Sequence, residues 1–238
     1  MLKNIFRIIV IFVIGMVGGI FADQILWPYL GEDPFFYEYQ QAKVPVSLIE
    51  KNEITIQENV ALQEAVERVE KAVVGIRTKT KDGKTISGSG IAVTSDGLIV
   101  TLAELVPREG DFVFFVDGKT PDWQILKRDV KNNLVLIKVE EKDLATVGFA
   151  DFNGLKLGER VFLVGVIFPE SELIKIVNEG IVKYLTEDYI RTNIFENNTL
   201  TGSPLFNIKG ELLGLNKIDS QARVTAIPIN TIREFIGF

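Results

Sequence analysis

The amino-acid types available for catalysis are restricted, because the 238 residues include neither histidine nor cysteine. Imidazole is the only side chain whose unperturbed pKa suits proton transfer near neutral pH, so a histidine-dependent general base is excluded. The lack of cysteine removes a thiol nucleophile and a disulfide framework, and the lack of both residue types excludes an ordinary zinc site. We therefore expect neither a metal nor another cofactor.

Two Asp-Gly-Lys-Thr tetrapeptides, at residues 82–85 and 117–120, resemble the end of a phosphate-binding loop. Such a loop needs a glycine five positions before its second glycine, and Thr78 and Val113 occupy those positions. Asp-Gly between strands is instead typical of a hairpin turn. The sequence predicts turns at both places.

Several blocks of sequence, in a fixed order, resemble trypsin-like serine proteases of the HtrA/Deg kind. The blocks are Gly88–Val93, Ser95–Thr101, Asp129–Lys138, Leu157–Gly165, Asn178–Val182, Thr199–Leu205, Lys209–Asn216 and Ala226–Asn230. The resemblance extends from about Asn59 to Phe238, which is most of the chain. The resemblance implies an all-β fold of two six-stranded antiparallel barrels, with the site in the cleft between them.

The resemblance also places a catalytic triad, and all three positions depart from the family. Glu104 occupies the histidine position, Asn133 the aspartate position and Thr201 the serine position. Asn133 cannot stabilise a developing imidazolium, and the β-methyl group of Thr201 restricts the rotamer of its hydroxyl. Glu104 would need burial to gain the basicity of a general base.

The loop before the nucleophile position is altered as well. Thr199 lies where the family has a glycine, whose conformational freedom lets backbone N–H groups converge on an oxyanion. A β-branched residue is disfavoured at unusual φ and ψ angles. We therefore expect the oxyanion loop, formed by Thr199 and Thr201, to be impaired and the catalytic site to be degenerate.

The elements that must position these residues are mostly strands. Short β-rich segments punctuated by Gly, Asp and Asn are typical of a sandwich or barrel. The predicted strands are 73–80, 90–94, 98–101, 112–116, 123–129, 134–139, 160–167, 173–177, 181–184, 189–193, 205–208, 212–215 and 224–227. A short helix is predicted from an N-cap at Asn59 to about Lys71, and a final helix from an N-cap at Asn230 to Phe235.

The N-terminus predicts a membrane segment. Lys3 and Arg7 precede an uncharged apolar stretch over residues 8–22, which is close to the shortest length that spans a bilayer, about 17 residues. A cleaved signal peptide is the alternative, with Ala22 before the cut, although Ile20 suits such a site poorly. Both interpretations place the C-terminal domain outside the cytoplasm by the positive-inside rule. We favour a retained single-pass anchor in the cell membrane.

Three domains follow from this organisation: an anchor over 1–27, a juxtamembrane linker over 28–56 and a protease-homology domain over 57–238. Residues 24–45 combine six aromatic side chains with three prolines. This composition is typical of an interfacial aromatic belt, and it also suits a contact between subunits of a homo-oligomer. Both interpretations stay open.

The charge pattern limits the class of partner. The net charge is −6 and lysine and arginine form no stripe, so nucleic-acid binding is not expected. We predict a proteolytically inactive homologue that binds a peptide or protein in its cleft by edge-strand addition. The alternatives are an active endopeptidase that uses Thr201 and Glu104, and a structural scaffold. The chain ends at Phe238, directly after the expected barrel, so no PDZ domain is expected.

Overall fold

The computed structural model of the protein describes residues 2–22, 24 and 60–238. Its contacts divide the chain into two units, Met1–Thr55 and Ile56–Phe238. The linker expected over 28–56 lies outside the described residues, as does the aromatic segment of 24–45 except for residue 24. The expected N-cap Asn59 also lies outside them.

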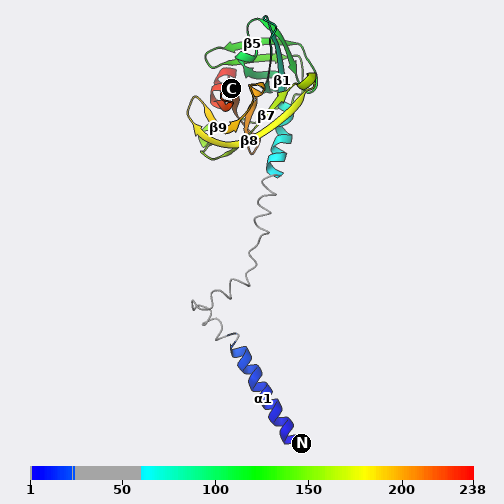
Figure 1. The fold of residues 1–238 in the computed structure, drawn as a ribbon, viewed down its shortest axis with the longest axis vertical. Coiled ribbons are helices and arrows are strands. Elements are labelled where there is room, and N and C mark those ends of the chain that lie inside the picture. The colour runs from blue at the N-terminus through cyan, green and yellow to red at the C-terminus, as the bar shows by residue number, and fades with distance from the viewer. Residues whose placement is uncertain (1, 23, 25–59) are drawn as a thin grey trace. The chain divides into compact units, whose positions relative to one another are not determined.

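The first unit contains helix α1 (Leu2–Phe21), drawn in blue in Figure 1. Its side chains from Lys3 onward are exposed, and the stretch Lys3–Phe21 is long and apolar enough to cross a membrane. The helix thus covers nearly all of the apolar segment that the sequence predicts. A signal sequence has the same length and composition, so the helix alone does not distinguish an anchor from a leader.

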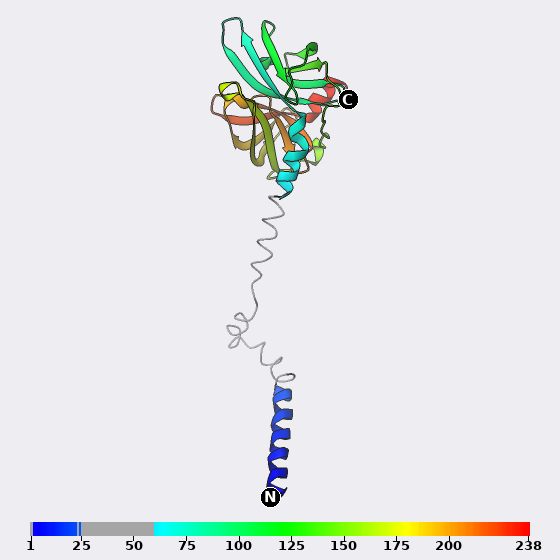
Figure 2. The ribbon, with the colours of Figure 1, turned by 90° about the vertical axis from the view of Figure 1, so that its right-hand side faces the viewer.

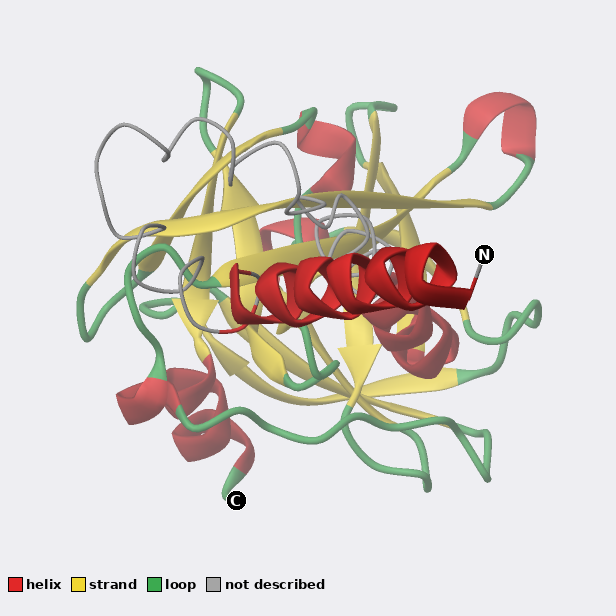
Figure 3. Ribbon diagram, turned by 90° about the horizontal axis from the view of Figure 1, so that it is seen from below, coloured by secondary structure: helices red, strands yellow, loops and turns green. Residues whose placement is uncertain are grey.

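Strands make up the body of the second unit, where the helical segments are short (Figure 3). The strands are β1 (Val73–Thr80), β2 (Thr85–Ala92), β3 (Leu98–Leu102), β4 (Gly110–Phe115), β5 (Trp123–Asp129), β6 (Leu134–Val139), β7 (Arg160–Ile167), β8 (Ile174–Leu185), β9 (Ile190–Phe195), β10 (Pro204–Asn207), β11 (Leu212–Ile218) and β12 (Arg223–Pro228). Both Asp-Gly tetrapeptides form turns, with Gly83 and Gly118 at positive φ.

The first six strands form one antiparallel sheet in the order β4-β1-β2-β3-β6-β5. The sheet is a half-barrel, because its edge strands β4 and β5 are not paired with each other. A side chain bridges them instead: Trp123 Nε1 donates to the Phe112 carbonyl at 3.2 Å. The Trp123 ring also packs edge-on against Phe112 and Phe114, with centroids 5.5 Å apart in each pair.

The last six strands form a closed barrel in the order β10-β11-β12-β9-β8-β7. Pairing between β10 and β7 completes the ring, with Leu205 opposite Leu163 and Phe206 opposite Phe162. The all-β two-barrel architecture predicted from the sequence is thus confirmed, with one barrel closed and the other half-closed.

Several local predictions are wrong. Strand β2 begins at Thr85 rather than at the predicted Gly90. Strand β8 is continuous across residues 178–180, which separate two of the predicted strands, because these residues pair with β7 and Gly180 is a place of close approach rather than a turn. A Cβ atom there would collide with Asn193 Oδ1, which accepts a hydrogen bond from Ile181 N at 2.8 Å. The final helix α5 (Ile229–Ile236) is capped by Pro228 without a side-chain hydrogen bond, so Asn230 is not its N-cap.

Two helices attach to the barrels on different sides of the domain (Figure 2). Residues 60–69 form the first, which buries Ala65 and Val69 and continues into a 3-10 turn at Glu70–Ala72. Helix α5 buries Ile229, Ile232 and Phe235. Lys127 Nζ donates to the Phe235 carbonyl at 2.6 Å, so α5 is also tied to the first sheet.

Candidate functional site

Glu104 and Asn133 lie side by side at the cleft edge of the first sheet. Glu104 is in the 3-10 turn η4 (Ala103–Leu105) after β3, and Asn133 is in the turn between β5 and β6. Asn133 Nδ2 donates to Glu104 Oε1 at 2.9 Å, and Asn133 Oδ1 accepts from the Glu104 backbone N–H at 3.0 Å. The Asn133 carbonyl accepts from Ala103 N at 2.9 Å. The Asn133 amide therefore binds both the main chain and the side chain of Glu104 in η4.

The backbone of Asn133 has a φ of 56°. Asparagine tolerates this left-handed conformation better than most residues. The conformation lets one residue present its carbonyl and its side-chain amide to the same turn. Arg128 also binds this turn, with NH1 donating to the Ala103 carbonyl at 3.2 Å.

The Glu104 side chain is exposed to solvent. The burial that a carboxylate would need to act as a general base near neutral pH is therefore not provided at this position. Its Oε1 atom is instead occupied as the acceptor of the Asn133 amide.

Thr201 lies at the end of the 3-10 turn η7 (Asn198–Leu200) and is 8% exposed. Its backbone N–H donates to the Asn198 carbonyl at 3.1 Å, and its carbonyl accepts from Ser89 N at 2.9 Å. Among the residues described, no hydrogen bond joins its hydroxyl to Glu104 or Asn133. The structure pairs two of the three positions singled out from the sequence and leaves the third bonded to other partners.

Thr199 does not have a positive φ angle. It is an exposed residue of the η7 turn, and the residue with positive φ in this loop is Gly202, at 78°. Gly202 N donates to the Asn216 carbonyl at 2.8 Å. A Cβ atom on Gly202 would collide with the Ser89 carbonyl oxygen.

Buried polar residues that the sequence reasoning missed form the floor beneath this loop. Ser89 Oγ accepts from Val166 N at 2.8 Å, and Thr101 Oγ1 donates to the Ser89 carbonyl at 2.6 Å. Asn216 Nδ2 donates to Ser203 Oγ at 3.1 Å, while Asn216 Oδ1 is buried and has no partner in the described chain. The available signal was an asparagine directly after the apolar stretch over residues 212–215.

A cavity of about 500 Å³ opens beside Asn133, between the two barrels. Its lining comes from both barrels and from α5. The lining residues are Lys131, Asn132, Asn133, Asp188, Tyr189, Lys217, Ile218, Asp219, Thr225, Ala226, Ile227 and Thr231. This volume is within the range of ligand-binding pockets.

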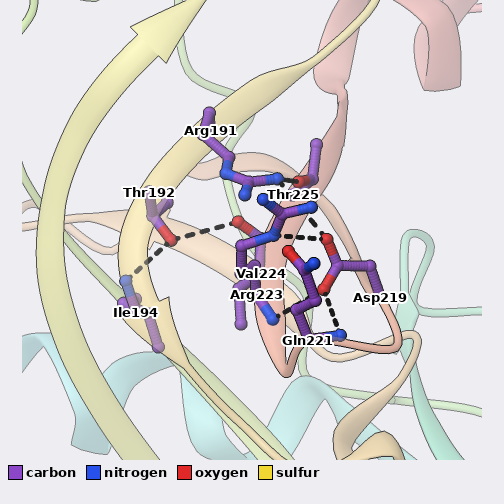
Figure 4. A network of polar contacts seen from close by, with 8 residues as sticks. All are labelled: Arg191, Thr192, Ile194, Asp219, Gln221, Arg223, Val224 and Thr225. Atoms are coloured by element: carbon purple, nitrogen blue, oxygen red, sulfur yellow. Dashed lines mark hydrogen bonds and ion pairs between the residues drawn. The ribbon is translucent and has the colours of Figure 1, made fainter.

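The turn between β11 and β12 forms one wall of this cavity and is held by Asp219 (Figure 4). Asp219 Oδ1 accepts from Gln221 N at 2.9 Å and Arg223 N at 3.0 Å, and Oδ2 accepts from Arg223 Nε at 2.7 Å. Arg191 lies 3.9 Å from Oδ2 and donates to Thr225 Oγ1. The Arg223 N–H, followed by the Arg223 side chain, lowers the pKa of Asp219 below its usual value.

Acidic side chains do not form a metal centre in the part of the chain that the structure describes. No group of three or more such side chains converges at 2–22, 24 or 60–238. The chemical groups at the three predicted positions are therefore the Glu104 carboxylate, which accepts a hydrogen bond from Asn133, the Asn133 amide and the Thr201 hydroxyl.

Residues 88–215 match the family model described as "Trypsin-like peptidase domain". The chain is 32% identical over 197 residues to "Serine protease HTRA1" of Xenopus tropicalis, covering 74% of this chain and 42% of that protein. It is 29% identical over 135 residues to "Probable periplasmic serine endoprotease DegP-like" of Halomonas elongata, covering 54% and 28%. The chain thus spans less than half the length of these relatives.

The solved structure "HtrA-type protease AlgW with tripeptide" superposes with a TM-score of 0.66 at 21% identity, covering 74% of this chain and 62% of that one. At this identity the likeness concerns the fold. The family model covers more than half of this chain, and the HTRA1 relative covers about three quarters of it. The protein belongs to the trypsin-like peptidase family, with relatives of the HtrA type.

Proposed function

We propose that this protein is a membrane-anchored, extracytoplasmic pseudoprotease that binds an extended peptide or a protein segment without cleaving it. The observation that carries the proposal is the pairing of Glu104 with Asn133 in a chain that has no histidine. The carboxylate at the general-base position is engaged by an amide, and no hydrogen bond in the described chain links it to the Thr201 hydroxyl.

The loop geometry supports the lack of cleavage. In the trypsin-like triad, the oxyanion is bound by the backbone N–H of the nucleophile and that of the residue two positions before it. The N–H at the nucleophile position, Thr201, already donates to the Asn198 carbonyl at 3.1 Å. A donor turned into its own loop cannot stabilise a developing oxyanion.

The cleft supports a binding role. Strand β11 pairs with β12 through Ile218 but with β10 only through Leu215. The N–H and carbonyl of Asn216 are already bonded to Ser203 and Gly202. Main-chain groups of successive strand residues point to opposite edges, so those of Lys217 face β12 and those of Ile218 are the first on the open edge. Ile218 also lines the 500 Å³ cavity, so a peptide strand added at this edge would lie beside it.

Activity is tested on the full-length protein in detergent. We expect no turnover of unfolded casein and no labelling by a fluorophosphonate probe, with an active trypsin-like protease as the positive control. Stoichiometric labelling of Thr201, or casein turnover abolished by Thr201→Ala, would refute the proposal and establish an endopeptidase.

The membrane topology is tested by cysteine labelling. Because the chain has no native cysteine, each introduced cysteine is the only thiol that can react. A single cysteine introduced at Ser220, on the exposed β11–β12 turn, should react with a membrane-impermeant maleimide in intact cells. A cysteine introduced at Asn4 should react only after lysis. Protection of Ser220→Cys in intact cells would place the domain in the cytoplasm and contradict the proposal.

A further inference from the structure

The cleft cavity contains two lysines that come from opposite barrels. Lys131 belongs to the β5–β6 turn of the first sheet, and Lys217 belongs to β11 of the closed barrel. Both side chains are exposed, and neither forms an ion pair within the described chain. The cavity thus has two ammonium groups that form no ion pair within the described chain, although the protein as a whole has a net charge of −6.

The acidic groups around these lysines are mostly committed elsewhere. Asp219 is bound by the side chain and backbone of Arg223, at 2.7 and 3.0 Å. Asp129, two residues before Lys131, accepts from Asn132 N at 3.1 Å and from Asn132 Nδ2 at 2.7 Å. These bonds are the main cause of its lowered pKa, to which the Lys131 charge adds a smaller effect without forming an ion pair. Asp188 is the lining carboxylate that has no hydrogen bond or ion pair in the described chain.

Lys217 is the neighbour of Ile218, the first residue of β11 with main-chain groups on the open edge, and both residues line the cavity. A peptide added at this edge therefore passes beside the cavity. Tyr189 and Ile218 supply apolar walls, while the two lysines supply positive charge. An ammonium group without a partner gains most from a carboxylate that arrives with the ligand.

We infer that the cavity between Lys131 and Lys217 receives a carboxylate of the bound chain, so that the protein selects acidic peptide segments. The carboxylate comes from an Asp or Glu side chain or from a peptide C-terminus. This inference rests on the proposed binding function, and it assigns the chemistry of the partner.

The test uses the full-length protein in nanodiscs of zwitterionic phosphatidylcholine and three fluorescent peptides of one apolar, unstructured sequence. The first peptide is neutral with an amidated C-terminus, the second adds one internal glutamate and keeps the amide, and the third is neutral with a free C-terminal carboxylate. We expect at least one acidic form to bind about fivefold more tightly than the neutral form at low ionic strength. The preference should fall towards unity in about 0.5 M salt.

Lysine variants locate the preference. Lys131→Gln/Lys217→Gln should reduce the acidic preference to less than about twofold while the neutral peptide binds as before. Lys142→Gln/Lys156→Gln removes the same charge from residues outside the cavity and should leave the preference intact. Circular dichroism of each variant checks that the fold is kept.

The outcomes separate the two proposals. Equal binding of all three peptides, or a preference that survives Lys131→Gln/Lys217→Gln, overturns this inference and leaves the binding function standing. No binding of any peptide at millimolar concentration overturns both. A stronger effect of glutamate than of the free C-terminus, or the reverse, identifies which carboxylate the cavity takes.

Discussion

Asn133 binds Glu104 through both ends of its side-chain amide: Nδ2 donates to Oε1 at 2.9 Å, and Oδ1 accepts from the Glu104 N–H at 3.0 Å. The relationship uses both halves of the amide. Its NH2 group donates to the carboxylate while its separate carbonyl oxygen accepts from the N–H, which a carboxylate at position 133 could not do. At the positions where the family has the catalytic histidine and aspartate, this chain therefore has a hydrogen-bonded pair that holds the η4 turn.

The first prediction concerns Asn133→Asp. A second carboxylate cannot donate to Glu104, and the two negative charges would repel each other. We expect the free energy of unfolding at pH 7 to fall by about 1 kcal/mol, a modest value because Glu104 is exposed and solvent screens the repulsion. The loss should shrink as the pH falls and one of the two carboxylates takes up a proton. Urea unfolding of the full-length protein at several pH values measures this.

Glu104→Gln is the matched control for Asn133→Asp. The glutamine Oε1 still accepts from Asn133 Nδ2, so the single variant should be nearly neutral. In the double variant Glu104→Gln/Asn133→Asp, the glutamine amide donates to the new carboxylate and most of the stability should return. A double variant as unstable as Asn133→Asp alone would show that the observed hydrogen bonds do not matter.

A second prediction concerns Asp219, which fixes the β11–β12 turn beside the cavity. Its pKa is lowered in the folded protein, chiefly by the Arg223 N–H, so its contribution to stability is present above the unfolded pKa, near 3.9. That contribution is lost as the pH falls through the lower folded value. Asp219→Asn should therefore lower the melting temperature at pH 7 and should differ little from the wild type in strong acid.

Asp188→Asn is the control for Asp219→Asn, since Asp188 is an exposed acid of the same cavity without a hydrogen bond in the described chain. It should leave the melting temperature at pH 7 almost unchanged. If the two variants have the same melting curve across the pH range, the network around Asp219 does not stabilise the turn.

A third prediction separates backbone strain from steric collision at two glycines. Gly202 and Gly118 have nearly equal φ angles, 78° and 76°, but a Cβ atom on Gly202 meets the Ser89 carbonyl, whereas one on Gly118 meets nothing within 4 Å. Gly118→Ala should cost about 1 kcal/mol of stability, and Gly202→Ala about 3 kcal/mol or more. Equal costs in urea unfolding would mean that the loop moves to accommodate the methyl group.

The sequence predicted strand boundaries best where a β-prone segment lies between clear turn residues. Strands β1, β5, β6 and β7 begin and end as predicted, because each is an uninterrupted β-prone segment bounded by turn residues. Strand β2 begins at Thr85, before the predicted Gly90, because pairing with β1 over residues 85–91 overrides the low strand propensity of its glycines and serines.

The candidate site was predictable only in part, because its contacts depend on tertiary geometry. The order of the sequence blocks pointed to Glu104, Asn133 and Thr201, but the Glu104–Asn133 bonding depends on the left-handed backbone of Asn133. The cavity that joins Lys131 to Lys217 exists only after the barrels pack, and no short-range pattern links two residues so distant in the sequence.

The last prediction concerns restoring the family's residue types. The triple variant Glu104→His/Asn133→Asp/Thr201→Ser should hydrolyse little substrate, because the N–H of residue 201 remains bonded to the Asn198 carbonyl in the η7 turn. Adding Thr199→Gly frees the backbone before residue 201 to turn its N–H groups towards an oxyanion, and one such donor is worth about 10²- to 10³-fold in rate. We expect fluorophosphonate labelling at residue 201 to be much faster in the quadruple variant. The same quadruple background with Thr201→Ala in place of Thr201→Ser is the control and should not label. A triple variant as reactive as the quadruple one would show that Thr199 does not restrain the loop.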